Sequence, residues 1–435
     1  MGKLIEPRVL KGFRDFLPTQ EAERLRIMHL LQQTFSAHGF VPIDTPILEY
    51  TEILLGKGGG ETDKQIYRFK DQGGRDVAMR YDLTVPFARF MAAHLHELYL
   101  PFKRFHMAKA FRGENTQRGR YREFVQCDFD VVGTDAASAD FEIVCMIDAA
   151  FRAMGVDEVR IHFAHRGVFN ALLASLDVSS RTDEVLRTVD KLRKIGEQKV
   201  RAELDALVGT DAARRVLALV SAAGTNEEIL AQMRELVPGA AEPAGRVETI
   251  LDAAQALGVA DRLVLDPSIT RGLDYYTGIV FETFLTQLPQ IGSVCSGGRY
   301  DDLAGLYTKE ALPGVGASIG LDRLMAALEE LGLAAAAAGA ADAVVLCTDD
   351  ALMALYHRVA RDLRAAGLRV EVYPESRKLA AQYSYAEKKG IPAAVICGPG
   401  EAASNTVTVR DLRNRTNREG VTVEEAAQAV RAIAG

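Results

Sequence analysis

The stretch from Phe124 to Val131, FVQCDFDV, constrains the fold more than any other part of the chain, because it sorts its side chains into two rows. Successive side chains of a β-strand point to opposite faces of the sheet. One row is apolar and the other holds a ring, an amide and two acids: Val125, Cys127, Phe129 and Val131 against Phe124, Gln126, Asp128 and Asp130. We therefore predict a strand that lays its apolar row on a core and presents its polar row to something outside.

An arginine cluster precedes this strand. Four arginines stand within eleven residues, at Arg112, Arg118, Arg120 and Arg122. Arg112 shares strand parity with Ala110 and Ala108, whose small side chains leave room for a ligand. A hairpin with arginines near its tip and a polar row along one strand fits a ligand that has both anionic and cationic parts. The cluster alone fits a solvated hairpin equally well.

Composition restricts the class of protein. The chain has 435 residues, of which 48% are hydrophobic and 26% charged, and its formal net charge is −7, as in ordinary globular proteins. No apolar run approaches the ~20 residues of a membrane helix, and the N-terminus lacks the apolar core of a signal peptide, so we expect a cytoplasmic protein and no membrane partner. Five widely spaced cysteines without a CxxC pair predict neither a disulfide framework nor a zinc site.

Hydrophobic periodicity divides the first 330 residues into distinct regions. Residues 21–38 place apolar side chains at helical spacing. The proline-containing segment FVPIDTPILE after them favours an edge strand. Residues 67–133 hold short β-like runs joined by turns, which indicates a mostly antiparallel sheet. Helical spacing among many charges returns at about 179–256 and indicates a helical insertion.

A low-complexity segment, LAAAAAGAAD, indicates a linker between two domains. Beyond it, strand-like and helix-like segments alternate, which predicts a small α/β domain of about 95 residues. The predicted organisation is a first domain at 1–330 that includes the insertion, a linker at 331–341 and a second domain at 342–435.

Three further segments carry residues suited to ligand binding: RGLDYYTG at 271–278, SGGRYDDL at 296–303 and GVGASIGLDRL at 314–324. Arginine neutralises phosphate or carboxylate, tyrosine hydroxyls fix polar ligands, and glycine lets the backbone approach a neighbour closely. Each segment also fits ordinary packing when taken alone. The spacing GxGxxxG differs from the dinucleotide fingerprint GxGxxG, and no segment matches GxxxxGK[ST], so neither nucleotide-binding motif is favoured.

Two smaller polar groups interrupt an apolar region. Asp82 and Thr84 fit a turn or helix cap as well as a substrate clamp. His94 and His96 would share a strand-like face, and without a third ligand nearby in the sequence they argue against a metal site.

Together these segments resemble the motifs of the class II aminoacyl-tRNA synthetases and, within that class, of the histidyl-tRNA synthetases. GFVPIDTPILE is similar to the first motif of the class, with Pro46 as its characteristic proline, FRGENTQRGRYREF to the second and GVGASIGLDRL to the third. RGLDYY and SGGRYDDL are similar to the two signatures of the histidine-specific subgroup. The resemblance implies an α+β fold: an antiparallel six-stranded catalytic sheet flanked by helices, a helical insertion that touches the tRNA acceptor arm, and a C-terminal α/β anticodon-binding domain.

The resemblance also implies a histidine-binding set. The implied contacts are Asp82 and Thr84 at the α-amino group, Gln126 at the α-amino and carboxylate end, Asp130 and Tyr276 at the imidazole nitrogens, and Tyr275 along the same pocket. Arg271 would lie opposite Arg112 at the reacting α-phosphate, and these two arginines would be catalytic. Asp82 and Asp130 stand where some family members have glutamate, which changes reach but not charge.

For ATP and tRNA the resemblance implies further contacts. ATP would meet Arg112 at the α-phosphate, Glu114 and Arg120 on the adenine and phosphate side, Phe124 stacked on the adenine, and Arg323 at the γ-phosphate. Gln117 and Arg118, at the hairpin tip, would face the tRNA acceptor end, and Asp128 has no implied role. The family uses Mg²⁺ with ATP, without a tightly bound protein metal site, and its first motif builds a homodimer interface.

The resemblance implies an aminoacyl-tRNA ligase that joins L-histidine to tRNA(His) through a histidyl-adenylate and releases AMP and pyrophosphate. One alternative is the synthetase-like regulatory subunit of ATP phosphoribosyltransferase in histidine biosynthesis. That relative generally lacks the anticodon domain and the arginine at the position of Arg271, both of which this sequence has. A second alternative, an NAD-dependent dehydrogenase, would need GVGASIG to follow the dinucleotide pattern, which it does not.

Overall fold

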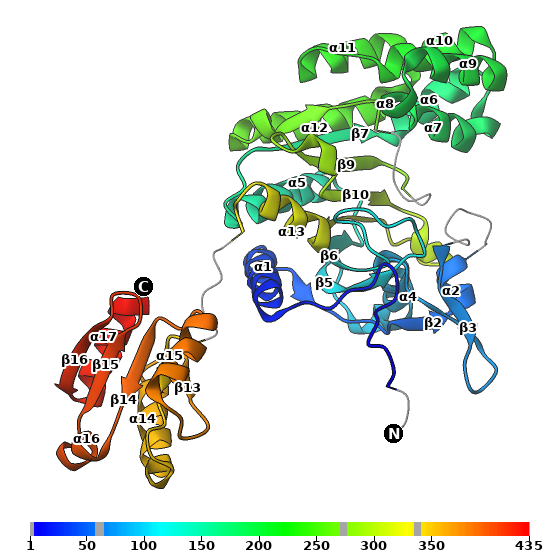
Figure 1. The fold of residues 1–435 in the computed structure, drawn as a ribbon. Helices are drawn as coiled ribbons and strands as arrows, with labels where there is room; N and C mark the ends of the chain where they lie inside the picture. The colour runs from blue at the N-terminus through cyan, green and yellow to red at the C-terminus, as the bar shows by residue number, and fades with distance from the viewer. Residues whose placement is uncertain (1–3, 57–64, 270–275, 335–340, 435) are drawn as a thin grey trace. The chain divides into compact units, whose positions relative to one another are not determined.

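The computed structural model describes residues 4–56, 65–269, 276–334 and 341–434. The chain divides into two compact units, Met1–Ala334 and Ala335–Gly435, each with its own core (Figure 1). None of the described helices combines the length and the apolar content that crossing a bilayer requires.

The larger unit is built on a sheet whose six central strands are antiparallel. Their order is β5 (Phe102–Phe111), β6 (Glu123–Val132), β11 (Gly314–Gly320), β10 (Cys295–Tyr300), β9 (Ile279–Leu285) and β7 (Val159–His165). The prediction of a six-stranded antiparallel sheet is confirmed. Two short parallel strands extend it at the edges, β1 (Val41–Pro42) beside β5 and β8 (Leu263–Leu265) beside β7. The proline-rich segment thus supplies an edge strand, as its sequence predicts.

One face of this sheet carries the main core. Helices α1 (Pro18–Ala37) and α5 (Ala137–Ala153) pack on it (Figure 1). The odd-numbered residues of β6 belong to that core, and the ring of Phe129 lies 4.9 Å from the ring of Phe35 in α1. Burying one such side chain stabilises the fold by roughly 1.5–3 kcal/mol. The predicted division of β6 into an apolar and a polar row is therefore confirmed on its apolar side.

A smaller layer covers part of the opposite face. Helix α4 (Thr84–His94) packs Phe87 and Met91 into a cluster with Val132 at the end of β6. Next to α4 lie the short helix α2 (Thr51–Leu55) and a sheet of β2 (Leu48–Tyr50), β4 (Asp76–Met79) and β3 (Arg68–Lys70). This layer covers the polar row of β6.

Helix α4 corrects two sequence expectations. Residues 67–133 are not uniformly strand-like, and His94 and His96 do not share a strand face: His94 ends α4, and His96 lies in the 3₁₀ turn after it. The run TVPFARFMAAH is rich in apolar and aromatic residues, which disguises its helical period. Asp82 supplies the start signal, because its Oδ1 accepts a hydrogen bond from Val85 N at 3.2 Å.

Helices fill the stretch predicted as an insertion. They are α7 (Thr182–Val189), α8 (Leu192–Ile195), α9 (Glu197–Val208), α10 (Thr210–Val220), α11 (Asn226–Leu236) and α12 (Ala241–Leu257). With α6 (Arg166–Ser175) they form the green group in Figure 1. Their buried side chains join the main core, and α12 packs against both α5 and β7. The insertion is thus continuous with the sheet that it interrupts.

The smaller unit has a mixed sheet in the order β13 (Val370–Val372), β12 (Ala343–Val345), β14 (Ala393–Ile396), β15 (Val407–Asp411) and β16 (Thr416–Val421). Its helices are α14 (Met353–Ala365), α15 (Leu379–Lys388), α16 (Pro399–Ser404) and α17 (Val423–Ala434). The predicted alternation is confirmed, but α16 and β16 were not predicted. The segment PGEAAS reads as a turn, and TNREGV has too little apolar alternation to indicate a strand.

Candidate active site

The polar row of β6 lies in the middle of the sheet and is almost fully buried. Gln126, Asp128 and Asp130 are only 8%, 2% and 3% exposed. Strands β5 and β11 flank β6, and the residues opposite Asp130 are Arg104 on β5 and Gly316 on β11. The surroundings of the row are therefore set by strand register.

Two buried partners fix the carboxylate of Asp130. Arg104 Nη2 lies 2.7 Å from Asp130 Oδ2, and the Tyr300 hydroxyl donates a hydrogen bond to Asp130 Oδ1 at 2.5 Å. Arg104 is fully buried and stands over the ring of Phe87 at 4.0 Å. Burial raises the pKa of Asp130, while Arg104 and Tyr300 act in the opposite direction.

Glycines make room for these side chains. A Cβ atom on Gly316 would lie 2.0 Å from Asp130 Oδ1, and one on Gly314 would lie 2.5 Å from the ring of Tyr300. A Cβ atom on Gly298 would lie 2.9 Å from the ring of Tyr276. The close approach predicted for the glycine-rich segments is confirmed, and the neighbours are side chains of the site.

Asp128, which has no role by resemblance, belongs to the same buried group of acids. Burial raises its pKa to about 7, against the influence of Arg104 and a hydrogen bond with Ser318, while Asp130 and Asp82 raise it further. Arg104 Nη2 is 3.9 Å from Asp128 Oδ2, farther than from Asp130. One guanidinium thus lies close to both carboxylates.

Asp82, Thr84 and Tyr276 complete this acidic end. Thr84 opens helix α4, and Asp82, two residues before it, is fully buried and accepts a hydrogen bond from Val85 N in the first turn. Burial and the charges of Asp130, Asp128 and Asp82 raise the pKa of Tyr276. The phenol and the three acids therefore lie within electrostatic reach of one another.

Gln126 connects the acidic end to an open pocket. Its Nε2 donates to Ser318 Oγ at 3.0 Å, and its buried Oε1 has no hydrogen-bond partner among the described residues. The pocket beyond it encloses about 660 Å³ of empty space, part of which is open to solvent. The predicted ATP-binding residues, Arg112, Glu114, Arg120, Phe124 and Arg323, all line it.

Arginines dominate this pocket. Arg112 donates through Nε to Tyr81 O at 2.8 Å, and its guanidinium lies 5.1 Å from the Phe124 ring centroid. Arg323 donates through Nη1 to Ser293 O at 2.5 Å. Burial and the neighbouring Arg120 and Arg112 lower the pKa of Arg323. Three guanidinium groups thus converge, and among the described residues only Arg120 pairs with a carboxylate, that of Glu114.

At the hairpin tip Gly119 and Arg120 line this pocket, whereas Gln117 and Arg118 do not. Gln117 and Arg120 exchange two backbone hydrogen bonds of 3.1 and 2.9 Å around Gly119, whose φ of +70° favours glycine. Arg118 Nη1 lies 2.7 Å from Glu330 Oε2 at the end of helix α13 (Leu321–Glu330). Gln117 and Arg118 thus lie outside the pocket lined by the predicted ATP-binding residues, and their role at tRNA stays a prediction.

Sequence reasoning missed two residues of the site and named two that cannot be located. Arg271 and Tyr275 lie outside the described residues. Arg104 and Tyr300, the partners of Asp130, were missed. The parity that links Arg112 to Ala110 and Ala108 continues back to Arg104, so this residue could have been found. Tyr300 stands in SGGRYDDL, but no sequence signal indicates its bond to a residue 170 positions earlier.

Comparison with known proteins identifies the same family along nearly the full length of the chain. The family model for histidyl-tRNA synthetase matches residues 12–324, and that for an anticodon binding domain matches residues 342–433. The histidine–tRNA ligases of Treponema denticola and Rhodopirellula baltica are each 49% identical to the chain, over 99% and 98% of both chains respectively. A crystal structure of histidyl-tRNA synthetase from Nostoc sp. PCC 7120 superposes with a TM-score of 0.87 at 33% identity, covering 99% of this chain and 100% of that one. The chain belongs to the histidyl-tRNA synthetase family.

Proposed function

We propose that this protein activates L-histidine with ATP and transfers the histidyl group to tRNA(His), releasing AMP and pyrophosphate. The observation that carries the proposal is the polar row of β6, which runs from an arginine-lined pocket at Phe124 to a buried acidic end at Asp130. A nucleoside triphosphate is anionic, whereas the α-ammonium and imidazole groups of histidine donate hydrogen bonds to acceptors. The two ends of the row match the two reactants.

The arginine pocket fits ATP. Arg112 would meet the α-phosphate, Arg323 the γ-phosphate and Phe124 the adenine face, with Glu114 and Arg120 on the adenine and phosphate side. Guanidinium groups hold their charge at any working pH and match phosphate oxygens in pairs. In the described residues no three His, Cys, Asp or Glu side chains gather in a metal-binding group. From the family we propose that Mg²⁺ comes with ATP and is held mainly by phosphate oxygens and water.

The acidic end fits histidine. Asp82 and Thr84 would hold the α-amino group, and the unpartnered Gln126 Oε1 offers it a further acceptor. Asp130 and Tyr276 would bond the two imidazole nitrogens. An apolar analogue would forgo both hydrogen bonds to the imidazole, at a cost of roughly 0.5–1.5 kcal/mol each. This penalty would give selectivity for histidine, with Tyr275 along the same wall.

The chemistry explains why positioning residues dominate. The histidine carboxylate oxygen attacks the α-phosphorus, the bond to the bridging oxygen breaks, and pyrophosphate leaves with that electron pair. Both reactants are anionic, so Arg112, with Arg271 proposed opposite it, would screen their approach and stabilise the oxygens of the transition state. Holding two reactants in line supplies much of the remaining acceleration. The 3′-hydroxyl of the terminal tRNA adenosine then attacks the histidyl-adenylate and displaces AMP.

The tRNA contacts are proposed from position and family. Gln117 and Arg118 stand at an exposed hairpin tip next to the arginine pocket and would face the acceptor end. The C-terminal unit matches an anticodon-binding domain and would read the other end of the tRNA. A cytoplasmic location stays a prediction.

The alternatives are not favoured. The regulatory-subunit reading conflicts with the match to an anticodon-binding domain and with near full-length identity to ligases. The dehydrogenase reading conflicts with the fold, since GVGASIG forms an interior strand of an antiparallel sheet and not the turn of a βαβ unit.

We also propose that the protein forms a homodimer and that the dimer interface covers one face of the three-stranded sheet of β2, β4 and β3. Leu48, Tyr50 and Phe69 are 46%, 48% and 48% exposed, and Tyr50 and Phe69 both pair with Val77, which places them on the same face. Nearby in the sequence, Val41 and Ile47 of the first motif are 46% and 42% exposed. Contiguous exposed apolar side chains mark interaction surfaces.

The dimer is testable by sedimentation equilibrium. The wild-type protein should have twice the mass of one chain, and Leu48→Asp should shift it to the monomer, because a charge would be buried in the interface. Leu257→Asp is a matched control, since Leu257 is 58% exposed on the insertion helix α12. A wild-type monomer, or equal effects of both variants, would refute the proposed face.

ATP–pyrophosphate exchange with each amino acid in turn tests the function. We expect label to enter ATP with histidine and not with the other amino acids, because only imidazole satisfies both Asp130 and Tyr276. Absence of exchange with histidine, or comparable exchange with another amino acid, would rule out the proposed activity.

Gly316→Ala tests whether the position of Asp130 sets histidine affinity. The new methyl group displaces the Asp130 carboxylate, so KM for histidine in the exchange reaction should rise about tenfold, which corresponds to roughly 1.4 kcal/mol, with KM for ATP little changed. Gly305→Ala is the control, because a Cβ atom there meets nothing within 4 Å. If both variants behave alike, the glycine does not serve the histidine site.

Asp128→Asn tests the acidic end through pH. A carboxyl group whose pKa rises from about 4 to about 7 on folding stabilises the fold while it is protonated, and that stability is lost progressively as pH rises from about 4 to about 7. Without ligands, Asp128→Asn should therefore raise the melting temperature more at pH 8 than at pH 5. An equal difference between the two proteins at both pH values would show that Asp128 does not titrate in this range.

A further inference from the structure

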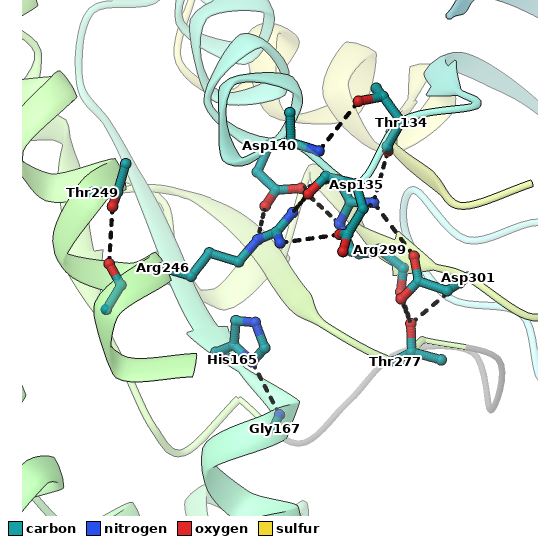
Figure 2. Close-up of polar contacts among 12 residues, drawn as sticks. Thr134, Asp135, Asp140, His165, Gly167, Arg246, Thr249, Thr277, Arg299 and Asp301 are labelled. Atoms are coloured by element: carbon teal, nitrogen blue, oxygen red, sulfur yellow. Dashed lines mark hydrogen bonds and ion pairs between the residues drawn. The ribbon is translucent and has the colours of Figure 1, made fainter. Parts of the chain in front are cut away.

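A buried ion network joins the helical insertion to the sheet, away from the reactants. Asp140 of α5 is fully buried and lies between Arg246 of α12 and Arg299 of β10 (Figure 2). Arg246 Nε donates to Asp140 Oδ2 at 2.6 Å, and Arg299 Nη2 and Nε donate to Asp140 Oδ1 at 2.7 and 3.0 Å. Each carboxylate oxygen therefore receives a different arginine.

A second aspartate links the same two arginines. Asp135 Oδ1 is 3.0 Å from Arg246 Nη1 and 3.4 Å from Arg299 Nη1. Backbone oxygens add two hydrogen bonds, from Arg246 Nη2 to Asp135 O at 2.9 Å and from Arg299 Nη1 to Thr134 O at 3.1 Å. Both guanidinium planes are thus fixed in direction, and Figure 2 shows the two arginines meeting at these acids.

The network reaches the residue that follows Tyr276. Thr277 N donates to Arg299 O at 2.8 Å, and Thr277 Oγ1 donates to Asp301 Oδ2 at 2.6 Å. Arg299 Nη1 contacts the other oxygen of Asp301 at 3.3 Å. The stem of Arg299 also underlies the next residue, because a Cβ atom on Gly278 would lie 3.0 Å from Arg299 Cδ. The backbone just after Tyr276 is therefore hydrogen-bonded to Arg299 and packed against it.

His165 adds no charge to the network at neutral pH. Burial lowers its pKa to about 4, and Arg246 and Arg299 lower it further. Its Nδ1 accepts a hydrogen bond from Gly167 N at 3.0 Å, which caps helix α6. The positive charges that face Asp140 are thus those of the two arginines.

The ion network contributes more to the orientation of its side chains than to the stability of the fold. The cost of desolvating buried ions largely offsets their attraction, so a buried ion pair adds little stability compared with apolar packing. The ion pairs do fix the orientation of the side chains, because an arginine that donates several hydrogen bonds to its acids holds them at fixed angles. Such a network can hold the backbone next to Tyr276 in a fixed position.

We infer that Arg246 is a positioning residue, through which helix α12 of the insertion holds Tyr276 in the histidine pocket by way of Asp140, Arg299 and Thr277. This inference rests on the proposed function, because it takes Tyr276 as a histidine contact. It gives the insertion a role in amino-acid binding in addition to its proposed contact with tRNA.

A double-mutant cycle in the exchange reaction tests the inference. Arg246→Met should raise KM for histidine about tenfold and leave KM for ATP within about twofold, a size typical of coupled networks. In a Thr277→Val background, which removes the hydroxyl that bonds Asp301, the same change should alter KM for histidine less than about twofold. Arg234→Met is the matched control: Arg234 pairs with Glu248 on the exposed side of the insertion and should have no effect.

The outcomes separate the inference from the proposed function. If the wild-type enzyme does not exchange with histidine, the function fails first. If it does, an unchanged KM for histidine in Arg246→Met, equal effects in both backgrounds, or a parallel rise in KM for ATP would overturn the positioning role. Should Arg246→Met fail to fold, Asp135→Ala replaces it, because Asp135 is 68% exposed and touches both arginines. It should raise KM for histidine severalfold, and no rise would overturn the inference.

Discussion

The active site is organised around one buried guanidinium, that of Arg104. Three carboxylates, Asp82, Asp128 and Asp130, lie in the interior near one another, and such a group is tolerated only with a counter-charge or with protons. Arg104 supplies the charge from the neighbouring strand, packs on Phe87 of the covering helix, and orients Asp130 together with Tyr300. Burial, together with the charges of Asp130 and Asp82, raises the pKa of Asp128. A buried acidic group of this kind would favour a cationic ligand.

We propose that strand β6 arranges the reactants in a line. Its even-numbered residues place an aromatic ring in the arginine pocket, an amide at the junction and two acids at the far end, while its odd-numbered residues hold the strand on the core. Histidine and ATP would therefore meet near Gln126, where the carboxylate of one faces the α-phosphate of the other. The site contains positioning groups and fixed charges rather than an acid–base pair, which suits a displacement between two anions.

Periodicity and motif spacing predicted much of this arrangement, because the relevant information is local. The two rows of β6, the antiparallel sheet, the α/β unit and the grouping of Arg112, Phe124 and Arg323 follow from strand parity and from family resemblance. The bonds from Arg104 and Tyr300 to Asp130 depend on strand register between distant segments, which alternation does not specify. Helix α4 was missed because its apolar run hides the helical period. The network from Arg246 to Thr277 joins segments far apart in the sequence and has no sequence signature.

A crystal structure with a non-hydrolysable histidyl-adenylate analogue measures the central claim most directly. We expect the imidazole within hydrogen-bond distance of Asp130 and Tyr276, the adenine on Phe124, and the phosphate replacement beside Arg112. An analogue bound in the reverse direction, or with its imidazole out of reach of Asp130, would contradict the proposal that the charge pattern along β6 sets the direction of both reactants.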